Sequence, residues 1–371
     1  MSSDSEPTKK QSEVHRPVLF LKSTLLLLVV SIFTWFAVAV MLPPIEPATW
    51  EAPANPGLVG VYASNERLSG VQFLSYAGVG PEDVACARDG SVYSGLDDGR
   101  IVRWRGPGAP QTVVNTRGRP LGMTFDNAGD LLVADAARGL LRVTPQGQVI
   151  VLADQYNGEP FKFADDLDIA GDGTIWFTDA SQRFGFRQTV LDFWEGSMTG
   201  RLLSYDPRSR QVRVHLENLF FANGVSVAPN DDYVLVSETG MARIQRLWLK
   251  GPKAGTVDTF IDELPAAPDN INIDNNGLLW IAMPSLRDSL DNAAGHPFLR
   301  QLFSVAPDIV LESLTNPISF VMAVDAQGNV IHNLQDPERR FPFITSAMPC
   351  NDLLLLGSLR TTALGVLPLP R

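Results

Sequence analysis

Cysteine and histidine are scarce in this sequence of 371 residues, which has two cysteines and four histidines. Cys86 and Cys350 form no Cys-x-x-Cys motif, and no Cys/His cluster occurs. A structural zinc site is therefore not expected, because it needs several such ligands at short spacings. The two thiols either meet in space as one disulfide or remain free and buried, and the sequence leaves both open. No motif pairs the histidines: His15, His215, His296 and His332.

Several enzyme motifs and an excess of basic residues are also missing. There is no G-x-S-x-G, so the serine of an α/β-hydrolase is not supported. There is no P-loop and no G-x-G-x-x-G that opens a helix. The chain carries 41 acidic and 30 basic side chains, a net charge of −11. Such an acidic surface argues against binding nucleic acid or anionic lipid, and it is compatible with binding a cation.

One long hydrophobic run is present near the N-terminus. Residues 23–42 contain no charge, and two prolines follow at once. About 20 apolar residues is the length that an α-helix needs to cross a bilayer. We therefore expect residues 23–42 to be a transmembrane signal-anchor, with a tail at 1–22 and a Pro-rich linker at 43–57. A cleaved signal peptide is the alternative, although its apolar region is usually shorter, about 7–15 residues.

The basic residues around this run predict its orientation. Four of them precede it, and the next one after it is Arg67. The positive-inside rule then places the N-terminus in the cytoplasm and the rest of the chain outside it. That space is the periplasm in a bacterium, or a lumenal or extracellular compartment. The sequence contains no N-x-S/T sequon, which fits the periplasm.

From residue 58 onward the chain repeats a turn with Asp, Asn or Gly followed by a short apolar strand. Six copies recur at intervals of about 40–75 residues: 89–95, 127–135, 171–179, 230–237, 274–282 and 351–358. A period of about 40–50 residues with several strands per unit is typical of a propeller. We expect an all-β, six-bladed β-propeller over residues 58–371, preceded by one transmembrane helix. Residues 58–76 should supply the strand that closes the last blade, and Asp288–His296 should be a surface loop.

Polar clusters precede four of these turns, in strands that should line the central channel: Pro81-Glu82-Asp83, Ala164-Asp165-Asp166, Ala222-Asn223-Gly224 and Pro268-Asp269-Asn270. Facing carboxylates repel one another and are costly to bury. A Ca²⁺ ion removes this conflict because it takes about 6–8 oxygen ligands. Each Asp or Asn alone also fits a turn cap, but capping does not require equivalent repeat positions. We expect Asp83 and Asp166 to orient neighbouring backbone groups.

Several stretches resemble the strictosidine synthase-like family, in the set that includes adipocyte plasma membrane-associated protein. They are Gly80-Pro81-Glu82-Asp83, 118–122, 219–225, 248–255 and 268–271. The pattern is more distantly similar to paraoxonases, gluconolactonases and diisopropylfluorophosphatase. The resemblance covers residues 58–371 and implies a six-bladed propeller with a channel calcium and an N-terminal membrane anchor. Carried over by position, the calcium ligands are Glu82, Asp165, Asn223 and Asp269, with Asn270 adjacent. The hydrolases commonly have asparagine at the place of Asp165.

Two departures from these relatives bear on function. Leu121 stands where paraoxonases carry a catalytic histidine. Thr345 or a neighbour stands where strictosidine synthases carry a catalytic glutamate, and no Glu lies between Phe341 and Leu359. A Pictet–Spengler condensation is therefore not favoured. The resemblance implies instead a calcium-dependent hydrolase of lactones or aryl esters, with Asp269 as general base or nucleophile.

Two alternatives remain open at this stage, a strictosidine synthase-like lyase and a non-catalytic, calcium-stabilised binding propeller. We expect the loops at the channel mouth, around residues 184–199 and 285–298, to determine substrate specificity. The expected partners are a small lactone or ester and, through residues 23–42, the lipid bilayer.

Overall fold

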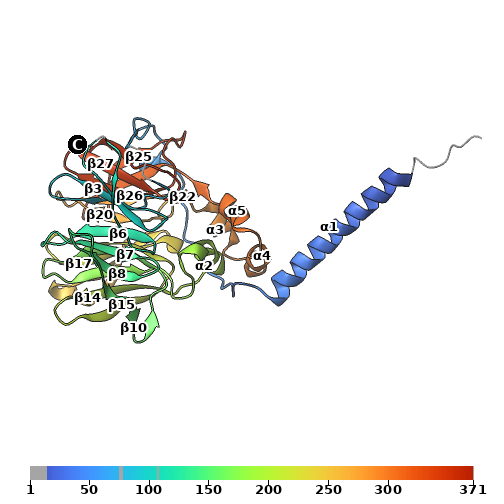
Figure 1. Cartoon of the computed structure of the whole chain (residues 1–371), viewed down its shortest axis with the longest axis horizontal. Coiled ribbons are helices and arrows are strands. Elements are labelled where there is room, and N and C mark those ends of the chain that lie inside the picture. Colours follow the sequence, from blue (N-terminus) through green and yellow to red (C-terminus); the bar gives the residue numbers. More distant parts are fainter. Residues whose placement is uncertain (1–14, 75–77, 107, 371) are drawn as a thin grey trace, which may run out of the picture.

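The computed structural model describes residues 15–74, 78–106 and 108–370, with side chains from residue 21 onward. Within these residues the strands form six four-stranded antiparallel sheets, the blades of a propeller (Figure 1). Blades 1 and 2 are β2 (Ala85–Cys86), β3 (Val92–Gly95), β4 (Arg100–Trp104) and β5 (Gln111–Asn115), then β6 (Pro120–Phe125), β7 (Leu131–Asp135), β8 (Gly139–Val143) and β9 (Val149–Ala153). Blades 3 and 4 are β12 (Ala164–Ile169), β13 (Ile175–Asp179), β14 (Gly200–Asp206) and β15 (Gln211–Leu219), then β16 (Ala222–Val227), β17 (Tyr233–Glu238), β18 (Arg243–Trp248) and β19 (Val257–Ile261).

The last two blades complete the ring. They are β20 (Ile271–Ile273), β21 (Leu279–Ala282), β24 (Phe320–Val324) and β25 (Val330–Gln335), then β26 (Ile344–Cys350), β27 (Leu353–Ser358), β28 (Gly365–Pro368) and β1 (Gln72–Phe73). Two short hairpins and three 3-10 helices lie in the connections of the chain: β10 (Gln155–Tyr156) with β11 (Glu159–Pro160), β22 (Ser285–Leu286) with β23 (Asn316–Pro317), η1 (Gly60–Tyr62), η3 (Thr239–Met241) and η4 (Gly251–Lys253). All six predicted turns join the first strand of a blade to its second, so the predicted six-bladed propeller is confirmed.

The ring closes in two ways. β1 pairs with β28, with Gln72 opposite Val366, so the segment before blade 1 supplies the outer strand of blade 6 as expected. A disulfide also joins Cys86 to Cys350, whose Cα atoms are 5.9 Å apart, and so links the first strands of blades 1 and 6. The sequence left the state of these cysteines open, and the structure makes them a bridge.

The core consists of apolar clusters, one between each pair of neighbouring blades. Successive residues of a strand point to opposite faces. Leu354 packs between blades 5 and 6, whereas Leu355 packs between blades 6 and 1. Both are essentially fully buried. This is why the second strands carry runs of consecutive apolar residues rather than alternating ones.

The N-terminal helix α1 (His15–Met41) begins earlier than the apolar run and ends where the prolines follow. Its segment Leu21–Met41 is long and apolar enough to cross a membrane. Nearly all its described side chains are exposed, but Ala39 is buried because the end of α1 packs against α4 (Pro297–Phe303).

Five short helical segments cover one end of the channel, and we call them the cap: η2 (Phe186–Gln188), α2 (Thr189–Glu195), α3 (Asp288–Ala293), α4 and α5 (Asp308–Ser313). They gather on the side of the propeller from which α1 leaves (Figure 1). The prediction of a loop at Asp288–His296 was wrong, because most of it forms α3. The Arg287–Asp291 ion pair, at 2.5 Å, and acidic residues in the first turn stabilise this short helix.

The Pro-rich segment at residues 43–57 is docked on the cap rather than free. The Ala48 amide donates to the Glu195 carbonyl at 2.9 Å, and Arg300 donates to the Ala48 carbonyl. Trp50 lies under the Arg300 guanidinium, 4.4 Å from it, and edge-on to Phe220 at 5.1 Å. The path from α1 to the propeller is therefore held in place at the channel mouth.

Candidate metal centre

Two of the predicted ligands lie where the first strand of a blade loses its regular pairing, whereas Glu82, Asp269 and Asn270 lie just before the first strands of their blades. The register shifts between Ala164 and Leu167 in β12, and between Ala222 and Val225 in β16. Asp165 and Asn223 follow the first residue of each shift. Such bulges bend the strand and re-aim a side chain. Here they bring side chains of different blades toward one channel.

Close approach of the inner strands at this level requires glycine. A Cβ on Gly224 would lie 2.6 Å from the Asp269 carbonyl oxygen, and one on Gly357 would lie 2.0 Å from the Glu82 carbonyl oxygen. Both distances are shorter than any side-chain carbon tolerates. The Asn223-Gly224 pair therefore places a candidate ligand and, beside it, a residue without a side chain that allows the next blade to approach.

The five candidate side chains are buried together, and none is more than 7% exposed: Glu82, Asp165, Asn223, Asp269 and Asn270. Asn270 Nδ2 donates to Glu82 Oε1 at 2.7 Å, which joins blades 5 and 1. One oxygen on each of four of these side chains has no hydrogen-bond partner: Glu82 Oε2, Asp165 Oδ2, Asn223 Oδ1 and Asn270 Oδ1. Buried polar atoms are rarely left unpaired, so this oxygen set fits a hard cation such as Ca²⁺.

Electrostatics in the channel opposes the charged form of these carboxyl groups. Burial, and then the negative charge of Asp269, raise the pKa of both Glu82 and Asp165 well above the ordinary range. Burial raises the pKa of Asp269 to about 7, against a hydrogen bond from Asn223. Within the described residues, no three Asp, Glu, His or Cys side chains are close enough to hold a metal by themselves. An ion here would therefore need the amide oxygens as well.

Asp83 and Asp166 bind backbone rather than the channel, as expected. Asp83 accepts from the Met123 amide at 2.9 Å and from the Ser346 hydroxyl at 2.6 Å. Asp166 accepts from the amides of Val225 and Leu167, both at 2.8 Å. Each carboxylate thus fastens its own blade to a neighbour directly behind the candidate ligands.

Thr345 occupies the bulge of blade 6, and its role is structural. Its side chain is fully buried, and its hydroxyl donates to the Glu82 carbonyl at 2.8 Å. In blade 3, the Thr178 hydroxyl likewise donates to the Asn223 carbonyl, at 2.7 Å. Thr345 is therefore not placed to act as an acid or base in the channel.

We expect Thr345→Val to destabilise the protein by about 1–3 kcal/mol, because it leaves the buried Glu82 carbonyl without this donor. The control is Thr112→Val on exposed β5, which makes the same chemical change and should leave stability unaltered. Urea unfolding of both variants measures the difference. Equal stability of the two would show that the Thr345 hydroxyl contributes nothing.

Two features of the site escaped the sequence interpretation. Arg119 is 2% exposed, donates to the Gly80 carbonyl at 2.9 Å, and is near enough to Glu82 and Asp165 to lower their pKa values. The Gly118-Arg119-Pro120 motif marked it, but only as family resemblance. Phe221 has φ of 63°, a left-handed value that is rare for a bulky residue and concentrates at functional sites.

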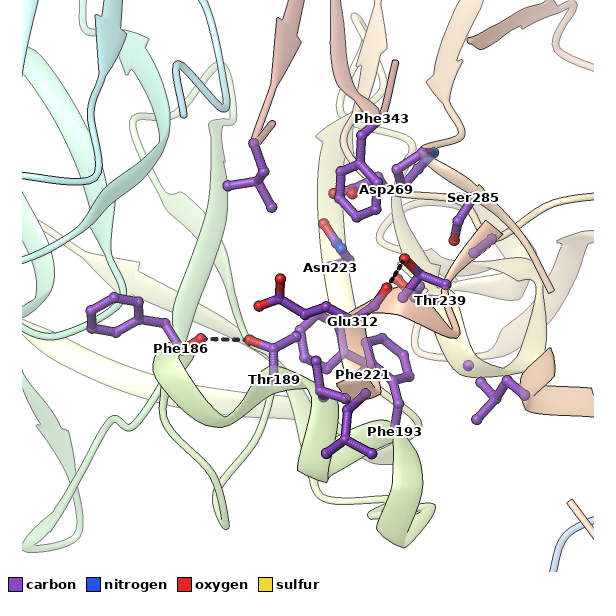
Figure 2. Close-up of a pocket in the computed structure, with 18 of the residues that line it drawn as sticks. Phe186, Thr189, Phe193, Phe221, Asn223, Thr239, Asp269, Ser285, Glu312 and Phe343 are labelled. Atoms are coloured by element: carbon purple, nitrogen blue, oxygen red, sulfur yellow. Dashed lines mark hydrogen bonds between the residues drawn. The ribbon is translucent and has the colours of Figure 1, made fainter. Parts of the chain in front are cut away.

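A cavity of about 430 Å³ opens above the candidate ligands. Glu82, Asp165, Asn223 and Asp269 line it, whereas Asn270 lies behind. Its walls are mainly apolar, and Figure 2 shows Asn223 and Asp269 among the rings of Phe193, Phe221 and Phe343. Leu121 lines the cavity, and no histidine does among the described residues. Both predicted specificity segments, 184–199 and 285–298, contribute to the walls.

Comparisons with known proteins find relatives along most of the chain. The family model of strictosidine synthase matches residues 165–252, and that of the strictosidine synthase-like N-terminal region matches residues 60–104. Protein strictosidine synthase-like 4 of Arabidopsis thaliana is 35% identical, over 86% of this chain and 88% of its own. Adipocyte plasma membrane-associated protein of Rattus norvegicus is 33% identical, over 91% of this chain and 97% of its own.

Among solved structures the likeness is one of fold. A gluconolactonase from Xanthomonas campestris superposes with a TM-score of 0.61 at 19% identity, covering 89% of this chain and 99% of that protein. A calcium-binding protein from Agrobacterium tumefaciens, regucalcin, gives a TM-score of 0.56 at 14% identity, covering 79% of this chain and 94% of its own.

Proposed function

Since this chain belongs to the strictosidine synthase-like family, we propose that it is a calcium-dependent hydrolase of lactones or aryl esters. The observation that carries the proposal is the set of four unpaired buried oxygens, three of which belong to residues that line one apolar cavity. Glu82, Asp165, Asn223, Asp269 and Asn270 would hold the ion. The names of the gluconolactonase and regucalcin neighbours add support for lactone chemistry and for calcium.

The side chains suit hydrolysis of an ester bond. When bound, calcium supplies a Lewis acid that polarises the substrate carbonyl. Asp269 takes a proton from water as the water oxygen adds to the carbonyl carbon. The bond from that carbon to the leaving oxygen then breaks, and the proton passes to the leaving alkoxide or phenolate. Phe221 and Phe343 hold the apolar part of the substrate and exclude bulk water.

The disulfide supports the proposed location. Disulfides persist in oxidising compartments and are rare in the cytosol. The Cys86–Cys350 bridge therefore favours a propeller outside the cytoplasm. Together with the four basic residues before the apolar run at 23–42, it supports an anchor whose N-terminus is cytoplasmic. The propeller would then lie in the periplasm, a lumen or the extracellular space.

Hydrolysis of a panel of water-soluble lactones and aryl esters by the full-length protein in detergent tests the activity. We expect turnover with calcium, its loss on adding EDTA, and its return when calcium is restored. Absence of turnover with calcium bound would contradict the proposal and favour a binding propeller instead.

A further inference from the structure

We infer that the cap lies in the surface of the same bilayer that α1 enters, so that the cavity opens against the membrane and takes lipophilic esters or lactones from it. The part of the cap that would contact the lipid consists of five side chains, Phe298, Leu299 and Phe303 on α4 with Ile309 and Val310 on α5. We call this part the apolar rim. The substrate part of this inference rests on the proposed hydrolase function, whereas the membrane contact rests on α1 being the anchor.

The contact between α1 and the cap determines how deep the cap lies in the bilayer. The Trp35 and Phe303 rings are 6.5 Å apart, and Gln301 Nε2 donates to the Ala39 carbonyl at 3.0 Å. Trp35 lies six residues before Met41, the end of the helix, which is about 9 Å along the axis. If α1 spans the bilayer to its C-terminal end, Phe303 lies at the boundary of headgroups and acyl chains. Amphipathic helices bury their apolar face about 5–10 Å into this boundary.

The apolar rim is exposed where a soluble surface would be polar. Ile309 is 78% exposed, Phe298 53%, and the other three 43–48%. Large apolar side chains that gather on one face mark a contact surface. These belong to adjacent short helices at the channel mouth, on the side of the molecule from which α1 leaves (Figure 1).

The rim and the cavity share a wall. Ile309 and Val310 point to solvent on α5, whereas Leu311 on the same helix is buried and lines the cavity. Val79 and Leu359, 56% and 38% exposed, are further apolar residues that line the cavity and also reach solvent. A molecule dissolved in the acyl chains would therefore reach the cavity along Ile309, Val310 and Leu311, past the acidic side chains of Asp308 and Glu312, which also line it.

Charge decides which lipid the rim fits. Asp308 and Glu312 are exposed on α5 beside Ile309 and Val310, and Arg300, the basic residue of α4, is fully buried. The protein as a whole carries a net charge of −11. Anionic headgroups would be repelled, so the occupant is a neutral or zwitterionic lipid surface entered by apolar side chains. The docked path from α1 through Ala48 and Trp50 holds the cap at that surface.

Site-specific fluorescence on the full-length protein in phosphatidylcholine vesicles tests the membrane contact. The natural cysteines are in a disulfide, so Ile309→Cys offers one free thiol for an environment-sensitive dye. The control is Val257→Cys, on outer strand β19 and 45% exposed. We expect lipids brominated on their acyl chains to quench most of the emission at Ile309 and none at Val257. Equal, weak quenching at both positions would overturn the inference and leave the rim for a protein partner.

A second measurement tests the substrate class and separates it from the hydrolase proposal. We expect the double variant Phe298→Asp/Ile309→Asp to lose most turnover of a long-chain aryl ester carried in the vesicles. It should keep its turnover of a water-soluble aryl ester, because neither residue lines the cavity. Equal loss on both esters, or on neither, would refute a membrane-borne substrate. No turnover of either ester by the unmodified protein would refute the hydrolase proposal, while the quenching result would still decide the membrane contact.

Discussion

Asp269→Asn is expected to lower kcat for a hydrolysed ester by about 10²–10⁴-fold, the usual contribution of a positioned general base. The amide keeps an oxygen that can face an ion, but it cannot take a proton from water. Asp269 lines the cavity and is 7% exposed, so solvent cannot readily replace it. Steady-state kinetics at saturating calcium measure the effect.

The matched control is Asp165→Asn, which makes the same change at another residue lining the cavity. Asparagine at this place still offers an oxygen ligand, so the variant should need more calcium but recover near-normal kcat when calcium is saturating. Recovery of Asp269→Asn at high calcium to the same extent would mean that Asp269 serves only as a ligand. Unchanged kcat in Asp269→Asn at every calcium concentration would remove it from the mechanism altogether.

Calcium is expected to raise the Tm of the propeller by about 6 °C at pH 7.5. A ligand at 1,000 times its Kd stabilises the folded state by about 4 kcal/mol. With an unfolding entropy of about 2.1 cal/mol/K per residue, each kcal/mol shifts the Tm of a propeller that spans residues 58–371 by about 1.5 °C. Calcium would also pair the four buried oxygens that lack partners. Differential scanning calorimetry with calcium and with EDTA gives the shift, and magnesium serves as the control ion because it prefers a tighter octahedral site.

The pH dependence without calcium should run opposite to that of most carboxylates. The pKa of Asp269 is raised from 3.8 to about 7 by burial. Between those values the folded state binds more protons than the unfolded state, so stability falls as pH rises. Raised pKa values at Glu82 and Asp165 act in the same direction. The calcium-free protein should therefore melt higher at pH 5 than at pH 8.

Calcium should reverse this trend, because it binds the ionised carboxylates and competes with protons. The shift in Tm caused by calcium should then grow from pH 5 to pH 8. A calcium shift that is the same at both values would show that the ion binds elsewhere. A calcium-free protein that is more stable at pH 8 would show that these carboxyl groups are solvated.

Much of the site could be predicted because the repeats are equivalent. One residue per blade at a matching position must face the axis of a ring. The sequence therefore predicted a group of four facing side chains, and the structure places all four around one cavity: Glu82, Asp165, Asn223 and Asp269. Whether they bind calcium remains a prediction. The repeats did not predict that Arg119 belongs to this group. It does not occupy the position that is equivalent in the other blades, although its guanidinium lines the same cavity.

By itself, the sequence determined the number of blades, the strands buried on both faces and the apolar N-terminal run, because each is a local and periodic pattern. Only the tertiary structure decided the Cys86–Cys350 bridge, whose partners are 264 residues apart. It also decided the cap and the docked linker, where Arg300 meets the Ala48 carbonyl. These features depend on contacts between segments distant in the chain. The short helices involved are too brief to show a period, so packing rather than pattern positions them.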